Sequence, residues 1–119
     1  MSCKVIFTDT AKDDLLDIAR GIAELSKDKN LAIRFVRELQ QETTRLEQFL
    51  ESGAVPRDRV LKSGGYRFLV HGEYLLFYLY KKEENAAYVM AVFNGRRDYM
   101  RVMREFLRLE KFDTTTPML

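Results

Sequence analysis

Apolar residues recur at helical spacing in two stretches of the N-terminal half of the chain. In the first stretch every third or fourth residue is apolar: Ala11, Leu15, Ile18, Ile22 and Leu25. In the second, apolar positions run from Ala32 to Leu50 and stop before residues 52–56, which contain helix-ending glycine and proline. Thr10 and Asn30 stand where N-caps are expected. Because a short polar linker joins the two stretches, they predict an antiparallel helical hairpin.

The pattern changes to short β-type runs in the second half. Residues 66–70, 74–80 and 87–93 are rich in aromatic and branched side chains and are separated by short turns, which predicts an antiparallel meander. The middle run is almost wholly apolar, as in a central strand covered on both faces. Residues 5–7 form a fourth run that can add to an edge of this sheet. A third helix is expected after Asn94-Gly95.

The resulting order, β-α-α-β-β-β-α, belongs to the α+β class: an N-terminal strand, a helical hairpin packed on an antiparallel sheet, and a C-terminal helix. A chain of 119 residues is long enough for one domain. We expect a single domain over residues 1–119, with its core in about 4–108 and a flexible tail at 112–119. No apolar run approaches the ~20 residues of a membrane span, and the N-terminus does not resemble a signal peptide. A cytoplasmic protein without membrane contact is therefore expected.

Composition argues against several classes of chemistry. The single cysteine, Cys3, excludes an intramolecular disulfide framework and a cysteine-based zinc cluster. The single histidine, His71, argues against His-based metal sites and Ser-His-Asp catalysis, and no cofactor is expected. The formal net charge is only +2, but residues 1–56 carry −2 and residues 57–111 carry +5. This concentration of basic residues indicates an anionic partner for the second half.

Arg67 lies within a predicted strand, between Tyr66 and Phe68. Because side chains alternate along a strand, its guanidinium is expected on the face opposite these rings. One interpretation is an exposed arginine, or one paired with a carboxylate such as Glu73. The other is a rigidly held guanidinium that binds a phosphate or carboxylate of a ligand.

The segment 94–99 (NGRRDY) places two arginines between a strand end and a helix start. Loops after strands often carry binding sites, and phosphates favour helix N-termini. Arg96 and Arg97 are therefore candidates for binding an anion. Alternatively, Asp98 pairs locally and Tyr99 packs in the core.

Four arginines form a stripe on the predicted C-terminal helix: Arg97, Arg101, Arg104 and Arg108. At 100° per residue they span about 60° and lie opposite the apolar side. Such a stripe is either a solvated face or a contact surface for nucleic acid or an acidic protein segment. Further cations add to the same basic half: Arg57, Arg59 and Lys62.

Three parts of the chain, in order, resemble the RelE/ParE superfamily of bacterial toxins. They are residues 8–15 (TDTAKDDL), 65–70 (GYRFLV) followed by 74–78 (YLLFY), and 92–99 (VFNGRRDY). The resemblance spans about residues 5–103. It implies an α+β toxin of a type II toxin–antitoxin system, serving plasmid stabilisation or stress response and neutralised by a cognate antitoxin. It also implies that operator DNA is contacted only through the antitoxin.

The superfamily has two main activities. ParE-like members inhibit DNA gyrase, and RelE-like members enter the ribosomal A site and cut mRNA. If the chain is RelE-like, the resemblance assigns catalytic roles to Arg67 and Arg97, which would stabilise the phosphorane formed during cleavage. The tyrosine of RelE-like enzymes falls near Met103 here, whereas the Arg-Arg-Asp-Tyr sequence that ends at Tyr99 is more similar to ParE-like members.

The resemblance therefore favours a ParE-like gyrase inhibitor. The alternatives are a RelE-like ribosome-dependent mRNA endonuclease and a degenerate, non-toxic module that only binds an antitoxin. The residues expected to bind the target are Arg67, Arg96, Arg97, Tyr99, Arg101 and Lys62. For the antitoxin, we expect an acidic amphipathic segment on the basic sheet face with the C-terminal helix, or in the groove along the helical hairpin.

Overall fold

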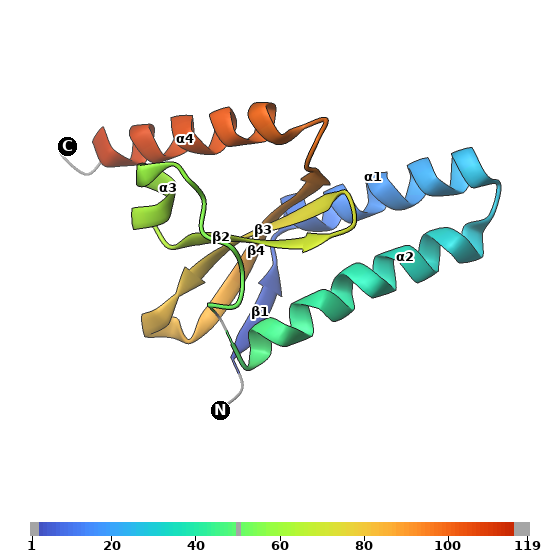
Figure 1. The fold of residues 1–119 in the computed structure, drawn as a ribbon, viewed down its shortest axis with the longest axis horizontal. Helices are drawn as coiled ribbons and strands as arrows, with labels where there is room; N and C mark the ends of the chain where they lie inside the picture. Colours follow the sequence, from blue (N-terminus) through green and yellow to red (C-terminus); the bar gives the residue numbers. More distant parts are fainter. Residues whose placement is uncertain (1–2, 50, 116–119) are drawn as a thin grey trace.

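A computed structural model of the chain describes residues 3–49 and 51–115, and its centre is a four-stranded sheet (Figure 1). The strands are β1 (Lys4–Phe7), β2 (Tyr66–His71), β3 (Tyr74–Lys81) and β4 (Ala86–Asn94), in the order β1-β4-β3-β2. β2, β3 and β4 form the antiparallel meander that the sequence predicts. β1 adds to the edge of this meander, as expected, and runs parallel to β4.

Two long helices, α1 (Asp9–Ser26) and α2 (Lys29–Glu42), form the predicted hairpin. The α-helix was expected to continue to Leu50, which lies outside the described residues, but it ends at Glu42 and a 3₁₀ helix, η1 (Thr43–Glu47), follows. The change of helical geometry leaves Phe49 exposed rather than on the buried face. Leu25, also expected to be buried, is 90% exposed because it lies at the tip of the hairpin, which extends beyond the sheet (Figure 1).

The N-caps of both helices differ from the prediction. α1 is capped by Thr8 rather than Thr10, and the Thr8 hydroxyl accepts a helix N–H and also donates to the Val89 carbonyl at 2.9 Å. This second bond ties the start of α1 to β4, a long-range contact that local capping rules do not contain. α2 is capped by Asp28 rather than Asn30, and the Asp28 carboxylate accepts two N–H groups of the first turn.

The sheet separates two hydrophobic layers. One face packs against the hairpin, where Leu39 of α2 meets Tyr78 of β3 in a buried cluster. The other face packs against α3 (Arg59–Ser63) and α4 (Tyr99–Thr115), in a cluster that includes Phe77 of β3. Figure 1 shows α3 and α4 on the side of the sheet opposite the hairpin. β3 is therefore covered on both faces, as its apolar sequence predicts, and the α+β architecture is confirmed.

A bulge in β4 decides which of its side chains face which layer. The register between β3 and β4 shifts so that Met90 is an extra residue. As a result, Val89 and Val92 both face the hairpin although they are three residues apart, and Phe93 faces α4. A strict alternation of inward and outward side chains, read from the sequence, does not predict that the bulge reverses which residues face the hairpin.

Three short elements were not expected: η1, α3 and η2 (Lys82–Glu84). Each has five residues or fewer, too few for a hydrophobic periodicity to show. α4 continues to Thr115, so the first part of the expected tail is helical, while residues 116–119 lie outside the described ones. In the part of the chain that the structure describes, no helix has the length and apolar character needed to cross a bilayer.

Candidate functional site

The turn between β4 and α4 gathers three of the predicted site residues, Arg96, Arg97 and Arg101. Asn94 organises this turn through its side chain and its carbonyl. The Asn94 Oδ1 accepts the N–H groups of Arg96 and Arg97 at 3.0 and 2.9 Å, and the Asn94 carbonyl accepts the N–H of Asp98 at 2.9 Å. Three successive backbone groups are thus fixed by one residue, and the arginine side chains project from a defined turn.

All three guanidiniums are exposed and only loosely paired. The side-chain exposures are 86% for Arg96, 76% for Arg97 and 68% for Arg101. Arg96 lies 3.8 Å from a carboxylate oxygen of Glu73, and Arg97 and Arg101 share Asp98 at 3.6 and 3.7 Å. The predicted local pairing of Asp98 is therefore confirmed. Exposed pairs of this kind contribute about 0–1 kcal/mol, so an anionic ligand can replace them.

Arg96 and Arg97 of this turn and Arg101 of α4 are together called the arginine turn. The arginine turn opens onto a groove of about 510 Å³ between α1 and α4. The end of β4 forms its floor. Asp14 and Asp17 line the α1 side, and Arg101 lines the α4 side. Apolar side chains lie between them, among them Ile18 and Phe106. The α4 side also carries Asp98 and Glu105, so two carboxylates lie beside its arginines. The groove therefore has an acidic α1 wall, an α4 wall of mixed charge and an apolar interior, which suits an amphipathic segment.

Asp14 was not singled out by the sequence. Its Oδ2 accepts the N–H of Val92 at 3.0 Å, on the edge of β4 beyond Val89, where β1 no longer pairs. Burial raises the pKa of the Asp14 carboxyl above its ordinary value of 3.8, although the Val92 N–H and the charge of Arg101 act in the opposite direction. The contact exists because the β4 bulge directs this N–H toward α1, which no local pattern could reveal.

Arg67 is placed apart from the arginine turn. It lies near the start of β2, opposite Tyr78, whereas the turn follows the end of β4. Its side chain faces away from its aromatic neighbours, as predicted, and is 23% exposed. The guanidinium donates to the carbonyls of Glu51 and Gly53 at 3.3 and 3.1 Å and lies 3.9 Å from the Glu51 carboxylate. Arg67 therefore holds the loop that follows η1.

The other predicted residues are either partly buried or lie on an element outside the arginine turn. Tyr99 is half-buried and its ring centroid lies 6.0 Å from that of Phe68, so it packs in the core. Lys62 is exposed on α3. Met103, where the resemblance places the tyrosine of RelE-like enzymes, is buried in the cluster between the sheet and α4.

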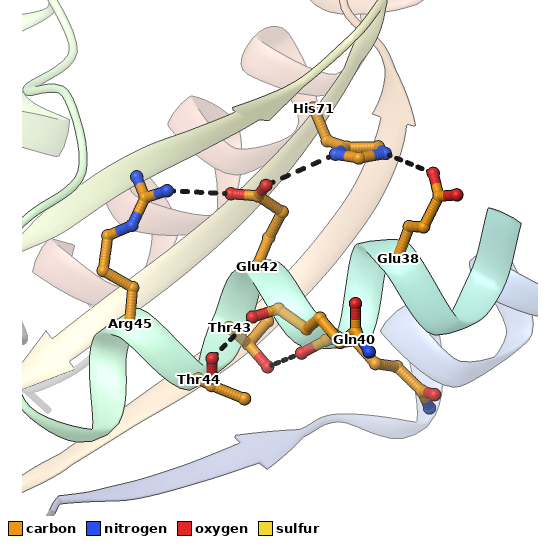
Figure 2. Close-up of polar contacts among 8 residues, drawn as sticks. Glu38, Gln40, Glu42, Thr43, Thr44, Arg45 and His71 are labelled. Carbon is orange, nitrogen blue, oxygen red and sulfur yellow. Dashed lines mark hydrogen bonds and ion pairs between the residues drawn. The ribbon is translucent and has the colours of Figure 1, made fainter. Parts of the chain in front are cut away.

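His71 joins the end of β2 to α2 (Figure 2). Its Nε2 lies 3.5 Å from Glu38 and its Nδ1 lies 3.5 Å from Glu42, which also contacts Arg45 at 3.4 Å. The ring packs edge-on against Phe35. The i, i+4 spacing of the two glutamates was the signal that could have pointed to this contact. Within residues 3–49 and 51–115, no group of three or more His, Cys, Asp or Glu side chains is arranged to hold a metal ion.

Comparison with known proteins gives one family and a shared fold. The family profile described as "ParE toxin of type II toxin-antitoxin system, parDE" matches residues 5–99. No curated protein sequence matches the chain. Among solved structures, a chain from "Chromosomal ParDE TA system from P. aeruginosa" is similar with a TM-score of 0.64 and 18% identity, over 78% of this chain and 96% of that one.

A second similar chain comes from the toxin–antitoxin complex RelBE2 of Mycobacterium tuberculosis. Its TM-score is 0.52 and its identity 21%, over 79% of this chain and 92% of that one. At these identities the two structures show a common fold. The family profile covers most of the described chain, including the segment that ends in the arginine turn. The chain therefore belongs to the ParE toxin family of type II toxin–antitoxin systems.

Proposed function

We propose that this chain is a growth-arresting toxin that acts in the cytoplasm by inhibiting DNA gyrase and is neutralised by a cognate antitoxin. We favour gyrase inhibition over mRNA cleavage because Arg67 and Arg97 lie in separate parts of the fold. Arg67 holds a loop at the start of β2, and Arg97 follows the end of β4. Cleavage of mRNA by the RelE-like route needs both guanidiniums on one phosphorane. The buried Met103 also supplies no base.

The contact with the target is proposed for the arginine turn, through Arg96, Arg97 and Arg101. These guanidiniums are exposed, and their present ion pairs are weak enough to be exchanged. Tyr99 contributes by anchoring the start of α4 in the core. Lys62 on α3 extends the basic surface beside α4.

The antitoxin contact is proposed for the α1–α4 groove. Leu25, at the tip of the hairpin, lines the groove and is almost fully exposed, and Ile22 and Phe106 line it deeper. Apolar anchors in a groove are the pattern that an amphipathic helix or strand recognises. Arg97 and Arg101 on the α4 side supply cations for an acidic residue of that segment, beside Asp98 and Glu105 of the same wall.

The gyrase assignment is tested with purified gyrase and the full chain. Wild-type protein should inhibit supercoiling of relaxed plasmid, and expression without an antitoxin should arrest growth. The triple variant R96Q/R97Q/R101Q should need at least about tenfold more protein for the same inhibition, since ~1.4 kcal/mol of binding energy corresponds to a factor of ten. The matched control R20Q/R34Q/R37Q removes three exposed arginines from α1 and α2 and should stay within twofold.

Two outcomes would overturn the assignment. Codon-associated cuts in mRNA during translation, with gyrase unaffected, would show a RelE-like endonuclease. Normal growth on expression without an antitoxin, with antitoxin binding intact, would show a degenerate binding module.

The antitoxin contact has its own matched pair of variants. L25E places a charge in the α1–α4 groove, and I33E places one on exposed α2 outside it. Co-purification with the product of an adjacent antitoxin gene should be lost for L25E and kept for I33E. Equal binding by both variants would place the antitoxin elsewhere.

A further inference from the structure

The sheet divides the charge of the molecule as well as its core. The hairpin layer, residues 9–47, carries 7 Lys and Arg against 9 Asp and Glu. The α3–α4 layer, residues 57–63 and 96–115, carries 9 Lys and Arg against 5 Asp and Glu. The two outer faces of the molecule therefore have opposite net charge. The sequence showed this imbalance only as a difference between two halves of the chain.

Two acidic side chains of the basic layer already have partners within it. Asp58 caps α3, and its Oδ1 accepts the N–H groups of Val60 and Leu61 at 2.8 and 3.3 Å. Asp98 is shared by two arginines of the turn. Only Glu105 remains along the described side chains of α4 to oppose its cations. The positive field of this face is therefore largely uncompensated.

The cations of α4 lie on one ridge. Arg101, Arg104 and Arg108 are exposed and fall within about 60° of one another around the helix axis. Tyr99 and Phe106, on the opposite side, pack toward the sheet. α4 forms an outer layer of the molecule (Figure 1). Arg104 and Arg108 lie on the side of the helix opposite the packed residues, whereas Arg101, on the same ridge, also lines the α1–α4 groove. Arg101 and Arg108 are seven residues apart, about 10 Å along the helix axis, so the ridge presents its guanidiniums along part of a convex rod.

We propose that this arginine ridge, together with the cations of α3, binds the phosphate backbone of double-stranded DNA without reading its sequence. A convex helix fits a groove of the duplex, where arginines reach phosphates on the flanking strands. Single-stranded nucleic acid is bound mainly by stacking on exposed aromatic rings, and Tyr99 and Phe106 instead face the core. An acidic protein segment would need several apolar anchors among the cations, and Met100 is the one large apolar side chain that is exposed in the described part of α4.

This contact goes beyond the proposed function and does not rest on it. Neither gyrase inhibition nor antitoxin binding requires the chain itself to contact DNA. It also adds to the expectation that operator DNA is contacted through the antitoxin, since a phosphate contact by the ridge is independent of sequence. A toxin that binds DNA directly is concentrated along DNA, whichever protein its arginine turn contacts.

The expected strength follows from counterion release. Each phosphate contact contributes a slope of about −0.9 to the plot of log K against log salt, so three ridge arginines give about −2.7. Binding independent of sequence typically has a Kd of about 10⁻⁴–10⁻⁶ M at physiological salt. Removing two of the contacts should therefore reduce the slope by about 1.8.

The test uses the full chain and a fluorescently labelled duplex of mixed sequence, with anisotropy measured over a salt series. The variant R104Q/R108Q changes only the ridge, and R34Q/R37Q removes the same charge from two exposed arginines of α2. The ridge variant should lose affinity at least about tenfold and show the reduced slope. The α2 variant should stay within twofold of wild type. Circular dichroism confirms that both variants are folded.

Three results would overturn the proposal. Equal losses in the two double variants would show attraction to bulk charge rather than a ridge. Tighter, ridge-dependent binding of single-stranded DNA or RNA of the same length would show a different ligand. No binding to the duplex at low salt would remove the site altogether. None of these results bears on gyrase inhibition, which the supercoiling assay measures separately.

Discussion

Arg67→Ala is expected to lower the free energy of unfolding of the protein, and not only to remove a binding contact. The Arg67 guanidinium donates to two carbonyls of the loop after η1, at 3.3 and 3.1 Å. The same loop returns to β2 through a bridge in which Ala54 and Phe68 exchange two backbone bonds, at 2.7 and 2.9 Å. It is also held by the Tyr78 hydroxyl, which accepts the N–H of Gly53 at 3.1 Å. Loss of Arg67 therefore releases one of the attachments that hold this loop.

The size of the effect follows from these contacts. Hydrogen bonds that involve a charged group contribute about 1.5–3 kcal/mol each when well buried. Arg67 is 23% exposed and its ion pair with Glu51 is long, at 3.9 Å, so we expect a total loss of about 2 kcal/mol. For a chain of this length 1 kcal/mol lowers Tm by about 3–6 °C, which predicts a decrease of about 6–12 °C.

The measurement is thermal and urea unfolding followed by circular dichroism. Arg20→Ala is the control, because Arg20 is 73% exposed and its pair with Asp17 lies on the surface of α1. The control should stay within about 0.5 kcal/mol of wild type. If Arg67→Ala is as stable as wild type, the loop is not held by these bonds. If it is as stable and has also lost gyrase inhibition, Arg67 contacts the target instead.

Three further changes probe contacts that fix the site. Gly53→Ala would place a Cβ 2.5 Å from the Phe68 carbonyl oxygen and 2.7 Å from the Tyr78 hydroxyl. Urea unfolding should therefore show that this variant loses about 2 kcal/mol of stability or more. Gly21→Ala, whose Cβ would enter open space on α1, should instead gain about 0.5–1 kcal/mol. Thr8→Ala should cost about 1–2 kcal/mol by the same assay, and Thr10→Ala, at the position first expected to be the cap, should cost less than about 0.5 kcal/mol. In the folded state the pKa of Asp14 is raised above 3.8, so ionisation of its carboxyl lowers the stability of the wild type as the pH rises through that range. Asp14→Asn keeps an oxygen acceptor for the Val92 N–H but cannot ionise. Its stability relative to wild type should therefore increase between about pH 3.5 and pH 7. A difference that is constant with pH would contradict the raised pKa.

The fold follows from the sequence where local pattern decides it. The period of about 3.6 residues in the hairpin and the apolar run of β3 predicted the helices and the central strand, and the structure confirms both. The cap of α1 was wrong because Thr8, not Thr10, is held by Val89, a residue 81 positions away. The contact of Asp14 with Val92 spans 78 positions and depends on a bulge. Such contacts exist only once the sheet has formed.

In the candidate site, too, local sequence predicts some contacts and not others. Arg96 and Arg97 were predicted at the junction of a strand and a helix, and a local signal, Asn94 two and three residues earlier, holds them there. Arg67 was predicted within a strand and on the correct face, but its partners are carbonyls of an irregular loop. Backbone carbonyls are present at every residue, so no residue type in the sequence marks which of them an arginine will bind.

Chain connectivity explains why the acidic start of α1 lies across the groove from the arginine turn. β1 adds in parallel to β4, so α1, which starts directly after β1, begins beside β4 with its acidic first turns. α4 leaves from the carboxyl end of β4, after the arginine turn, and crosses to the opposite face of the sheet. Both helices therefore flank the end of one strand, and the acidic residues favoured at a helix start face the arginines of the turn across it. A partner that enters this groove meets both layers of the molecule at once, whereas a partner of the α4 ridge meets only the basic one.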